Sequence, residues 1–228
     1  MRLGAAGNRP PVGSTSMPAT TAQEMRDHWV WRPEWTPERT CLYWYLTFQE
    51  DEITSAVGEP ALEEVRRTAW LDAIPPRWCH VTLTDIGFAD ELEASEVRRV
   101  GDAVARSVAG EHRLPLVLGP VQAYRSALVL ATGPLSRLRG IRKAVRRATS
   151  NVLRDRHADV HRYLFWPHVS LGYVNRSVDT RTVDRFLGRL PDVDARIEVG
   201  ALTLAAVTRR DRHYQWEVQA RVDLAGAG

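Results

Sequence analysis

Apolar and polar residues follow two rhythms along the chain, one typical of strands and one typical of helices. Runs rich in aromatic and β-branched residues, which favour strands, occupy residues 41–49, 78–87, 114–122, 126–132, 163–174, 195–208 and 213–224. Apolar residues that recur every three or four positions predict helices over residues 59–74, 91–110, 134–155 and 180–190. The last two strand segments are separated by four polar residues, which predicts a closing hairpin.

The order of these elements repeats. Up to about residue 122 the predicted order is strand, helix, strand, helix, strand, and a similar order begins again after it. We therefore predict a duplicated α+β fold. It forms a single bilobal domain over residues 41–224, with lobes at approximately 41–122 and 123–224.

Residues 1–40 lack this patterning. The first two dozen residues are rich in Pro, Gly, Ser and Thr and have no continuous apolar stretch of the kind found in signal peptides. They predict a partly disordered leader, for which Met17 and Met25 are alternative starts. His28, Trp29, Trp31 and Trp35 follow in a segment with little pattern, for which a wrap over one lobe is one interpretation.

The composition is that of an ordinary globular protein. Of the 228 residues, 44% are hydrophobic and 26% are charged, with a formal net charge of +3. This charge allows an anionic partner without requiring one, and Lys143 is the only lysine, so single arginines carry little weight. Cys41 and Cys79 lie in strand-like runs, which predicts buried, reduced thiols. No run of 18 apolar residues is present, so we predict a cytoplasmic protein with no membrane partner.

Two strand segments carry the same short motif. "RWCHVTLTDIGF" begins at Arg77 and "FWPHVSLGYVN" begins at Phe165, and both contain Trp-x-His-Val-[Thr/Ser]-Leu. Since side chains alternate across a strand, each motif buries an apolar row and turns a histidine and a hydroxyl to the other face. On that face we expect His80, Thr82 and Thr84 from the first motif. From the second we expect His168, Ser170 and Gly172.

A single motif of this kind is more simply interpreted as a strand histidine beside a β-favouring threonine. A second copy at the equivalent place changes the interpretation, because packing does not require matched imidazoles. Two histidines on opposite sides of one atom can act as general base and general acid near neutral pH. The hydroxyls of Thr82 and Ser170 can donate to phosphate oxygens. The pattern therefore predicts phosphoryl transfer at a phosphodiester without a metal or another cofactor.

The two motifs resemble those of the 2H phosphoesterase superfamily, in particular its 2'-5' RNA ligase branch with RNA 2',3'-cyclic phosphodiesterases. The resemblance covers roughly residues 41–224. It implies a bilobal fold in which two antiparallel sheets flank a central groove, with helices outside. It also implies hydrolysis of a 2',3'-cyclic phosphate on RNA ends or nucleotides, commonly leaving a 2'-phosphate. His80 and His168 would be catalytic and Thr82 and Ser170 would bind phosphate, with the acid and base roles open between the histidines.

Aromatic residues near the motifs are candidates for substrate binding. Trp78 and Trp166 stand two residues before each histidine, where they could stack on a nucleobase; a role as rim or core aromatics is the plainer alternative. Tyr124 and Arg125 lie in the turn that joins the two halves and are weaker candidates. Asp85, after the first motif, departs from an apolar strand end and can alter the groove edge.

Two further features have competing explanations. The helix at 134–155 is rich in arginine, which suits a phosphate backbone but also suits a solvated helix face. His157 and His161 have the spacing of two metal ligands, but no third ligand is visible and we predict no metal site. The alternatives to a cyclic phosphodiesterase are a 2'-5' RNA ligase or 2'-5' phosphodiesterase, a non-catalytic RNA- or nucleotide-binding module, and a zinc hydrolase. We expect a monomer.

Overall fold

The computed structural model describes residues 24–30, 34–154 and 165–225. Its α-helices are α1 (Glu50–Val57), α2 (Glu59–Arg67), α3 (Ala94–Ser107), α4 (Leu135–Leu153) and α5 (Thr180–Leu187). Three single 3-10 turns are η1 (His28–Val30), η2 (Pro76–Trp78) and η3 (Ala89–Glu91). The strands are β1 (Cys41–Thr47), β2 (Leu71–Ala73), β3 (His80–Phe88), β4 (Leu114–Tyr124), β5 (Ala127–Gly133), β6 (His168–Val174), β7 (Ala195–Val199), β8 (Ala201–Arg210) and β9 (His213–Asp223).

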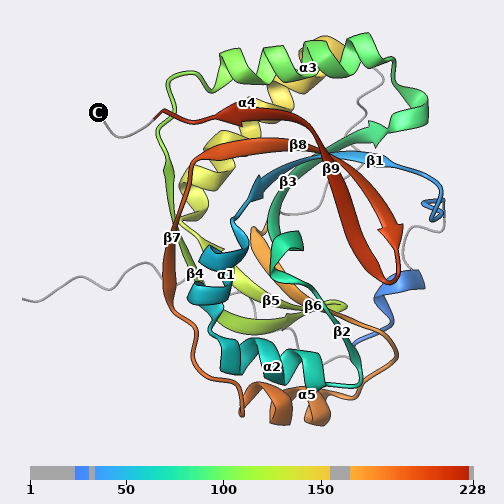
Figure 1. Cartoon of the computed structure of the whole chain (residues 1–228), viewed down its shortest axis with the longest axis vertical. Coiled ribbons are helices and arrows are strands. Elements are labelled where there is room, and N and C mark those ends of the chain that lie inside the picture. The colour runs from blue at the N-terminus through green and yellow to red at the C-terminus, as the bar shows by residue number, and fades with distance from the viewer. Residues whose placement is uncertain (1–23, 31–33, 155–164, 226–228) are drawn as a thin grey trace, which may run out of the picture.

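The strands form one curled sheet in the order β7-β4-β5-β6-β3-β1-β8-β9, with β2 beside β6. Its two central strands, β3 and β6, pair at Val81 and Val169. This pair divides the sheet into a first half-sheet (β3, β1, β8, β9) and a second half-sheet (β6, β5, β4, β7 and β2). Helices α3 and α4 lie outside the first half-sheet, and α2 and α5 lie outside the second (Figure 1). The predicted α+β fold of two antiparallel sheets with outer helices is confirmed, the two sheets being halves of one.

Each half-sheet draws on both parts of the sequence. The closing hairpin β8–β9 pairs with β1 in the first half-sheet, and β4 pairs with β5 and β7 in the second. Helix α4 follows β5 in sequence but packs against α3 and β3. The two strands that carry the histidine motifs thereby come together in the middle of the sheet.

The helix predicted over residues 59–74 is shorter in the structure. Pro60 does lie in the first turn of α2, but the helix ends at Arg67 and residues 71–73 form strand β2 on the edge of β6. Thr68 takes an extended conformation, and its hydroxyl donates to the carbonyl of Glu64. Trp70 then packs edge-on against Phe186 at 5.2 Å between ring centroids, which gives the chain after the helix a buried anchor.

The segment predicted as one strand over 195–208 is two strands. β7 ends at Val199 and pairs with β4, whereas β8 begins at Ala201 and pairs with β1 and β9. Gly200, between them, lies against the guanidinium of Arg113. The two strands thus belong to different half-sheets, and only the hairpin β8–β9 matches the prediction.

An irregularity in β3 changes the face of Thr84. Tyr45 pairs with Thr82 and Trp44 pairs with Thr84, so Leu83 is an additional residue in β3. An inserted residue reverses the alternation of the side chains that follow it. Thr84 is therefore buried, with 8% of its surface exposed, and the prediction that it shares a face with His80 was wrong. Asp85 is half-buried instead.

A second irregularity, in β6, changes the face of Gly172. Val129 pairs with Ser170 and Leu128 with Gly172, which makes Leu171 the additional residue. A Cβ on Gly172 would lie 3.3 Å from Cγ1 of Val65 in α2. Gly172 thus faces the outer helix, contrary to the prediction. Tyr173, not Gly172, turns to the side of Ser170, near enough for Ser170 to act on its pKa, which burial raises.

The described part of the N-terminal segment packs against the domain. Met25 pairs with Val178 through two backbone hydrogen bonds of 3.0 and 2.9 Å. Trp35 is buried and stacks on Tyr43 with ring centroids 5.7 Å apart. Residues 1–23, which make up most of the predicted leader, and Trp31 lie outside the described residues.

Cys41 and Cys79 are buried free thiols, as predicted. Burial raises the pKa of Cys79 to about 12, so this thiol stays protonated and unreactive. Among the described helices, none has the length and apolar character needed to cross a membrane.

Candidate active site

The antiparallel pairing of β3 with β6 brings the two motifs together on one face of the sheet. In an antiparallel pair centred on Val81 and Val169, His80 lies across from Ser170 and Thr82 lies across from His168. The two valines are fully buried, whereas the four polar side chains are half-buried on the other face. His80 and His168 are diagonal to each other across this pair, and diagonal side chains are still near neighbours.

Both imidazoles are held by the same backbone contact. Nδ1 of His80 lies 2.8 Å from the carbonyl oxygen of Trp78, and Nδ1 of His168 lies 2.8 Å from that of Trp166. A carbonyl can only accept, so each Nδ1 carries the hydrogen and donates it. In the neutral rings Nε2 therefore bears the free lone pair. Among the described residues, none forms a hydrogen bond with either Nε2.

The surroundings favour the neutral form of both rings. Burial lowers the pKa of His80 to about 4; the bond to Trp78 opposes this shift and the nearby His168 adds to it. Burial also lowers the pKa of His168, with the bond to Trp166 opposing and the charge of Arg125 adding. Each imidazole is thus a base in the free protein near neutral pH. A bound anion between them would favour a proton on one of the two.

Different aromatic rings contact the two histidines. Tyr45 of β1 stacks on His80 with ring centroids 3.9 Å apart, and Trp216 of β9 meets His80 edge-on at 5.1 Å. On the other side, Trp166 stacks on His168 at 5.2 Å and Tyr124 lies 5.5 Å from it. These rings restrict the imidazole planes and surround them with apolar surface.

The two predicted tryptophans occupy different local structures. Trp78 lies in η2, before β3 begins, where its ring meets Trp216 edge-on at 4.8 Å. Trp166 precedes β6 and packs against Tyr124 at 4.3 Å. Both are half-buried against the core, and both give their carbonyl oxygen to a motif histidine. The strand boundaries predicted at 78 and 163 therefore lie at His80 and His168 in the structure.

Tyr124 and Arg125, the weaker candidates, also lie at the site. They end β4 and begin the turn into β5, where Arg125 has a positive φ of 55°. The guanidinium of Arg125 lies 5.3 Å from the Tyr124 ring, and its charge acts on the pKa of His168. All eight predicted site residues therefore lie in the two motifs or beside them.

Sequence reasoning missed Tyr45, Trp216 and Tyr173. The ring of Tyr45 covers His80, Trp216 touches His80 and Trp78, and Tyr173 lies close to Ser170. Tyr45 and Trp216 are both on strands that were predicted, and their alternation could have marked them as facing the same side. Their contact with the motif depends on β1 and β9 joining β3 in one half-sheet, which the sequence alone did not indicate.

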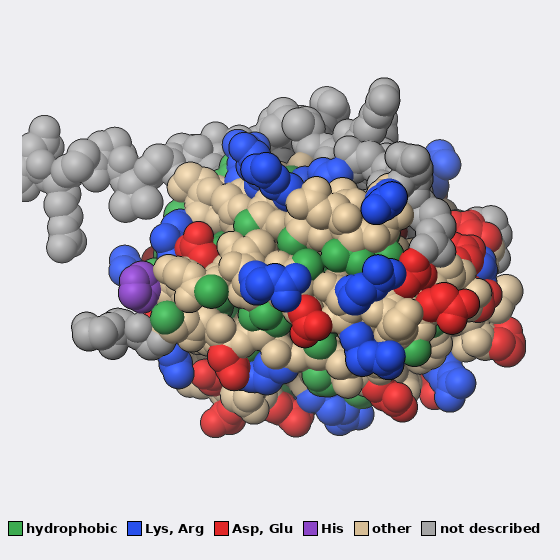
Figure 2. Space-filling model, turned by 90° about the horizontal axis from the view of Figure 1, so that it is seen from above, with side chains coloured by type: hydrophobic (Ala, Val, Ile, Leu, Met, Phe, Trp, Pro, Cys, Tyr) green, Lys and Arg blue, Asp and Glu red, His purple; other side chains and the backbone are tan. Residues whose placement is uncertain are grey.

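The charged residues of helix α4 are all basic, and acidic residues of neighbouring segments lie beside some of them. On the face seen from the side of α3, basic and acidic side chains are interspersed (Figure 2). Arg142 turns inward: its Nε donates to the carbonyl of Leu83 at 2.8 Å, and its guanidinium lies 4.8 Å from the Phe165 ring. Arg137 pairs with Glu111. Arg142 is thus used within the fold, whereas the exposed Arg137, Arg139, Lys143 and Arg147 are consistent with a solvated helix face.

His157 and His161, the two histidines with the spacing of metal ligands, lie outside the described residues. Within the described ranges, no cluster of three or more His, Cys, Asp or Glu side chains could hold a metal ion.

Comparison with known proteins identifies the family. A model of the 2'-5' RNA ligase superfamily matches residues 54–211. Among solved structures, TT0787 of Thermus thermophilus matches with a TM-score of 0.64 and 16% identity, over 82% of this chain and 100% of that chain. LigT of E. coli, in complex with 3'-AMP, matches with a TM-score of 0.58 and 15% identity, over 82% and 99%. No curated protein matches the chain. Because the family model covers more than half of the chain, this protein belongs to the 2'-5' RNA ligase superfamily, and the resemblance to 2H phosphoesterases is confirmed.

Proposed function

We propose that this protein is a metal-independent phosphodiesterase that hydrolyses 2',3'-cyclic phosphates on RNA ends or nucleotides. The observation that carries the proposal is the pair of matched imidazoles where β3 pairs with β6. Each has Nδ1 held by a backbone carbonyl two residues earlier. Each is accompanied by a hydroxyl on the opposite strand. A site that only bound phosphate would be served as well by arginine, and would not need two histidines held in the same tautomer.

In the proposed reaction one histidine is neutral and the other is protonated on Nε2. The neutral Nε2 takes a proton from water as the water oxygen bonds to phosphorus. The protonated Nε2 gives its proton to the ribose 3'-oxygen as the bond from phosphorus to that oxygen breaks. The product is a 2'-phosphate with a free 3'-hydroxyl, and the two histidines have exchanged protonation states. Exchange of protons with solvent restores the starting state.

The hydroxyls of Thr82 and Ser170 donate to the two non-bridging oxygens in this scheme. Their positions across from His168 and His80 place one donor beside each imidazole. Two hydroxyl contacts hold the phosphorus in line between the histidines. Such positioning, together with stabilisation of charge, supplies most of the catalysis in phosphoryl transfer. Each positioned acid or base typically contributes about 10²–10⁴-fold.

Solved structures of fold neighbours support a nucleotide as substrate. LigT of E. coli has been crystallised with 3'-AMP, with ATP and with phosphate. These ligands belong to that protein and bear on this one only through the shared fold. The half-buried rings of Trp78 and Trp166 offer apolar faces on which a base could stack.

A second candidate function is cleavage or ligation of 2'-5' linkages in RNA. The family model that matches the chain carries the name of that ligase. The same two histidines would serve, with a ribose 5'-hydroxyl in place of water. A non-catalytic RNA- or nucleotide-binding module is the alternative outside enzymology.

The test is incubation with the four nucleoside 2',3'-cyclic monophosphates and with an oligonucleotide that ends in a cyclic phosphate, with and without EDTA. Phosphorus NMR distinguishes a 2'-phosphate from a 3'-phosphate product. We expect a 2'-phosphate in both conditions. Binding of these compounds without turnover would support the binding module and overturn the proposal, and activity lost in EDTA would indicate a metal hydrolase. Conversion of 2'-5'-linked oligonucleotides alone would favour the second candidate.

A further inference from the structure

The two half-sheets share little backbone pairing at the site. Strands β3 and β6 pair at Val81 and Val169, whereas β8 pairs with β9 from Ala201 to Arg210. A single pair acts as a pivot and leaves the angle between the half-sheets to other contacts. That angle matters because one motif histidine lies on each half-sheet.

His28 connects the half-sheets at one end of the curled sheet. Its Nδ1 lies 2.8 Å from Oγ of Ser126, beside β5 in the second half-sheet. Its Nε2 lies 2.8 Å from the hydroxyl of Tyr214, on β9 in the first half-sheet. The imidazole also stacks on Tyr173 of β6, with ring centroids 4.1 Å apart. One side chain therefore touches both halves.

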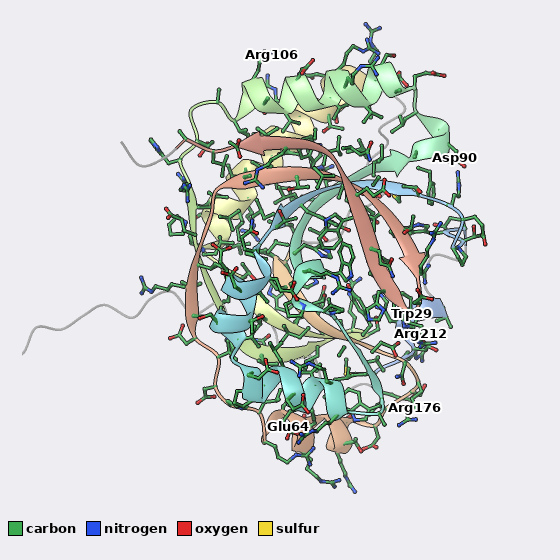
Figure 3. All side chains as sticks on the ribbon, in the orientation of Figure 1. Trp29, Glu64, Asp90, Arg106, Arg176 and Arg212 are labelled. Atoms are coloured by element: carbon green, nitrogen blue, oxygen red, sulfur yellow. The ribbon has the colours of Figure 1, made fainter. Side chains whose placement is uncertain are left out.

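Asp72 of β2 forms a second connection beside the first. Its carboxylate accepts hydrogen bonds from Nε1 of Trp29 at 2.8 Å, from Nε of Arg212 at 2.6 Å and from Nδ2 of Asn175 at 3.1 Å. Burial alone would raise the pKa of Asp72, but these three donors lower it, so the carboxylate stays charged. Trp29 of η1 and Arg212 of the β8–β9 turn lie close together, with the guanidinium 5.7 Å from the Trp29 ring (Figure 3).

The turn between β8 and β9 is held in a form that non-glycine residues rarely adopt. Asp211 and Arg212 have positive φ angles of 51° and 57°. Such conformations persist where the surroundings fix them. Here Arg212 binds Asp72 and also pairs with Asp27 at 3.5 Å, while His213 Nε2 lies 3.0 Å from a carbonyl oxygen of β2. The turn of the first half-sheet is thus fastened to β2 of the second.

These contacts continue to the site. Tyr173, on which His28 stacks, follows Ser170 by three residues on β6, and Ser170 lies near enough to act on its pKa. Ser126 directly follows Arg125, whose charge acts on His168. Tyr214 and Tyr173 both lie near enough to Tyr45 to act on its pKa, which is raised well above the usual value, chiefly by burial. Tyr45 in turn stacks on His80.

We propose that residues Asp27, His28 and Trp29, together with Asp72 and Arg212, form a clasp that sets the separation of His80 and His168. Within it, His28 is a positioning residue for both motifs. The N-terminal part of the clasp precedes residues 54–211, the region that the family model matches. The catalytic part of this inference rests on the proposed function, and the structural part does not.

The clasp gives His28 a bond that can be removed selectively. Of the two hydrogen bonds of His28, the one from Nδ1 goes to Ser126, in the turn before β5, and the one from Nε2 goes to Tyr214 in the first half-sheet. A glutamine amide reaches the position of Nε2, and an asparagine amide reaches that of Nδ1. His28→Gln can therefore keep the bond to Tyr214, whereas His28→Asn keeps only the bond to Ser126.

The first experiment is steady-state kinetics on a nucleoside 2',3'-cyclic phosphate. We expect kcat to fall by about 10²-fold in His28→Ala and His28→Asn, with little change in KM, because misplacement of acid and base affects the transition state. His28→Gln should recover most of kcat. The control is Arg39→Ala, which removes an N-terminal contact to Asp90 and Glu91 that stays within the first half-sheet. Equal kcat in the wild type, Ala and Asn variants would overturn the catalytic role.

The second experiment does not depend on activity. Spin labels at Arg106→Cys on α3 and Arg67→Cys on α2 report the distance between the outer helices by pulsed electron paramagnetic resonance. We expect a narrow distribution in the wild type and in Arg39→Ala, and a broader or shifted one in His28→Ala. An unchanged distribution would overturn the clasp. If the protein is inactive on every cyclic phosphate but the distance distribution still broadens in His28→Ala, the clasp is supported and the proposed function is overturned.

Discussion

Val81 of β3 pairs with Val169 of β6, and both side chains are completely buried. Each valine follows a motif histidine, so the pair places both imidazoles on the opposite face at the centre of the sheet. The hydroxyl residue after each valine lies across from the histidine of the other strand. A single buried pair of valines thus accounts for the arrangement of all four polar residues.

Removal of either motif histidine should strongly reduce turnover without unfolding the protein. We expect kcat for a nucleoside 2',3'-cyclic phosphate to fall by about 10²–10⁴-fold in His80→Ala and in His168→Ala, because each variant lacks an acid or a base. The double variant should be barely worse than either single one, since the two act as a unit. Circular dichroism and melting temperature check the fold. His112→Ala, at an exposed histidine before β4, is the control; retention of wild-type kcat in either motif variant would contradict the mechanism.

Loss of one hydroxyl should weaken phosphate binding as well as turnover. In Thr82→Val and Ser170→Ala the side chain no longer donates to a phosphate oxygen, so we expect kcat/KM to fall by about 10–10²-fold each. Isothermal titration with inorganic phosphate should show weaker binding in both. Thr84→Val is the matched control, because Thr84 is buried on the other face and its hydroxyl donates to the carbonyl of Asp85. An equal loss in Thr84→Val would indicate a structural effect.

The pH dependence should show a maximum of kcat/KM below pH 6.5. The proposed mechanism requires one neutral and one protonated imidazole in the free protein. The lowered pKa values of both histidines, about 4 for His80, make this singly protonated pair scarce above neutral pH. We therefore expect a bell-shaped profile whose alkaline limb falls tenfold per unit, measured from about pH 4 to 9. A maximum well above neutral pH would contradict these pKa shifts.

A matched pair of arginine variants checks the origin of this profile. The charge of Arg125 lowers the pKa of His168, so in Arg125→Ala that pKa should rise and the alkaline limb should move to higher pH. Arg77→Ala is the control: Arg77 lies 5.4 Å from the Trp78 ring, on the side of His80, and its charge is not among the causes of the His80 shift. Equal displacement of the limb in both variants would indicate a general effect of net charge.

The sequence predicted the motif faces because alternation over two residues is a local property of a strand. It could not predict the faces of Thr84 and Gly172. Additional residues at Leu83 and Leu171 reverse the alternation, and these irregularities are defined only against the partner strands. The division at Gly200 has the same origin, since the strand-like pattern continues through it while the partner strand changes from β4 to β1.

The residues around the motifs were harder to predict for a related reason. Trp216 and Tyr45 reach His80 only because β1 and β9 join the first half-sheet, which is a choice of topology. His28 lies in a segment without periodicity because its bonds, to Ser126 and Tyr214, span 98 and 186 residues. Such contacts leave no pattern in the local sequence. The interpretation of this segment as a wrap anticipated that it packs on the domain, but not its link to the site.

The tryptophans before each motif should contribute to binding of the nucleobase. We expect Trp166→Ala and Trp78→Ala to raise KM for nucleoside 2',3'-cyclic phosphates by about 5–150-fold, since base stacking is worth roughly 1–3 kcal/mol. The control is a change of substrate: ribose 2',3'-cyclic phosphate has no base, so its KM should not change. A matching increase for the base-free compound would show that the rings act by orienting the histidines, one of which stacks directly on Trp166.

His28 should make the stability of the protein depend on pH. Burial lowers its pKa to about 3, aided by the charge of Arg209 and opposed by Asp72, whereas in the unfolded chain it titrates near its ordinary value of about 6.5. Between these values the unfolded state binds the additional proton, so the free energy of unfolding falls as pH decreases below about 6.5, by up to about 1.4 kcal/mol per unit. His28→Gln carries no titratable group there and should show a correspondingly smaller loss between about pH 7 and 5. Urea denaturation at each pH measures the free energy of unfolding. If this free energy changes equally with pH in the two proteins, His28 takes up its proton without leaving the folded clasp.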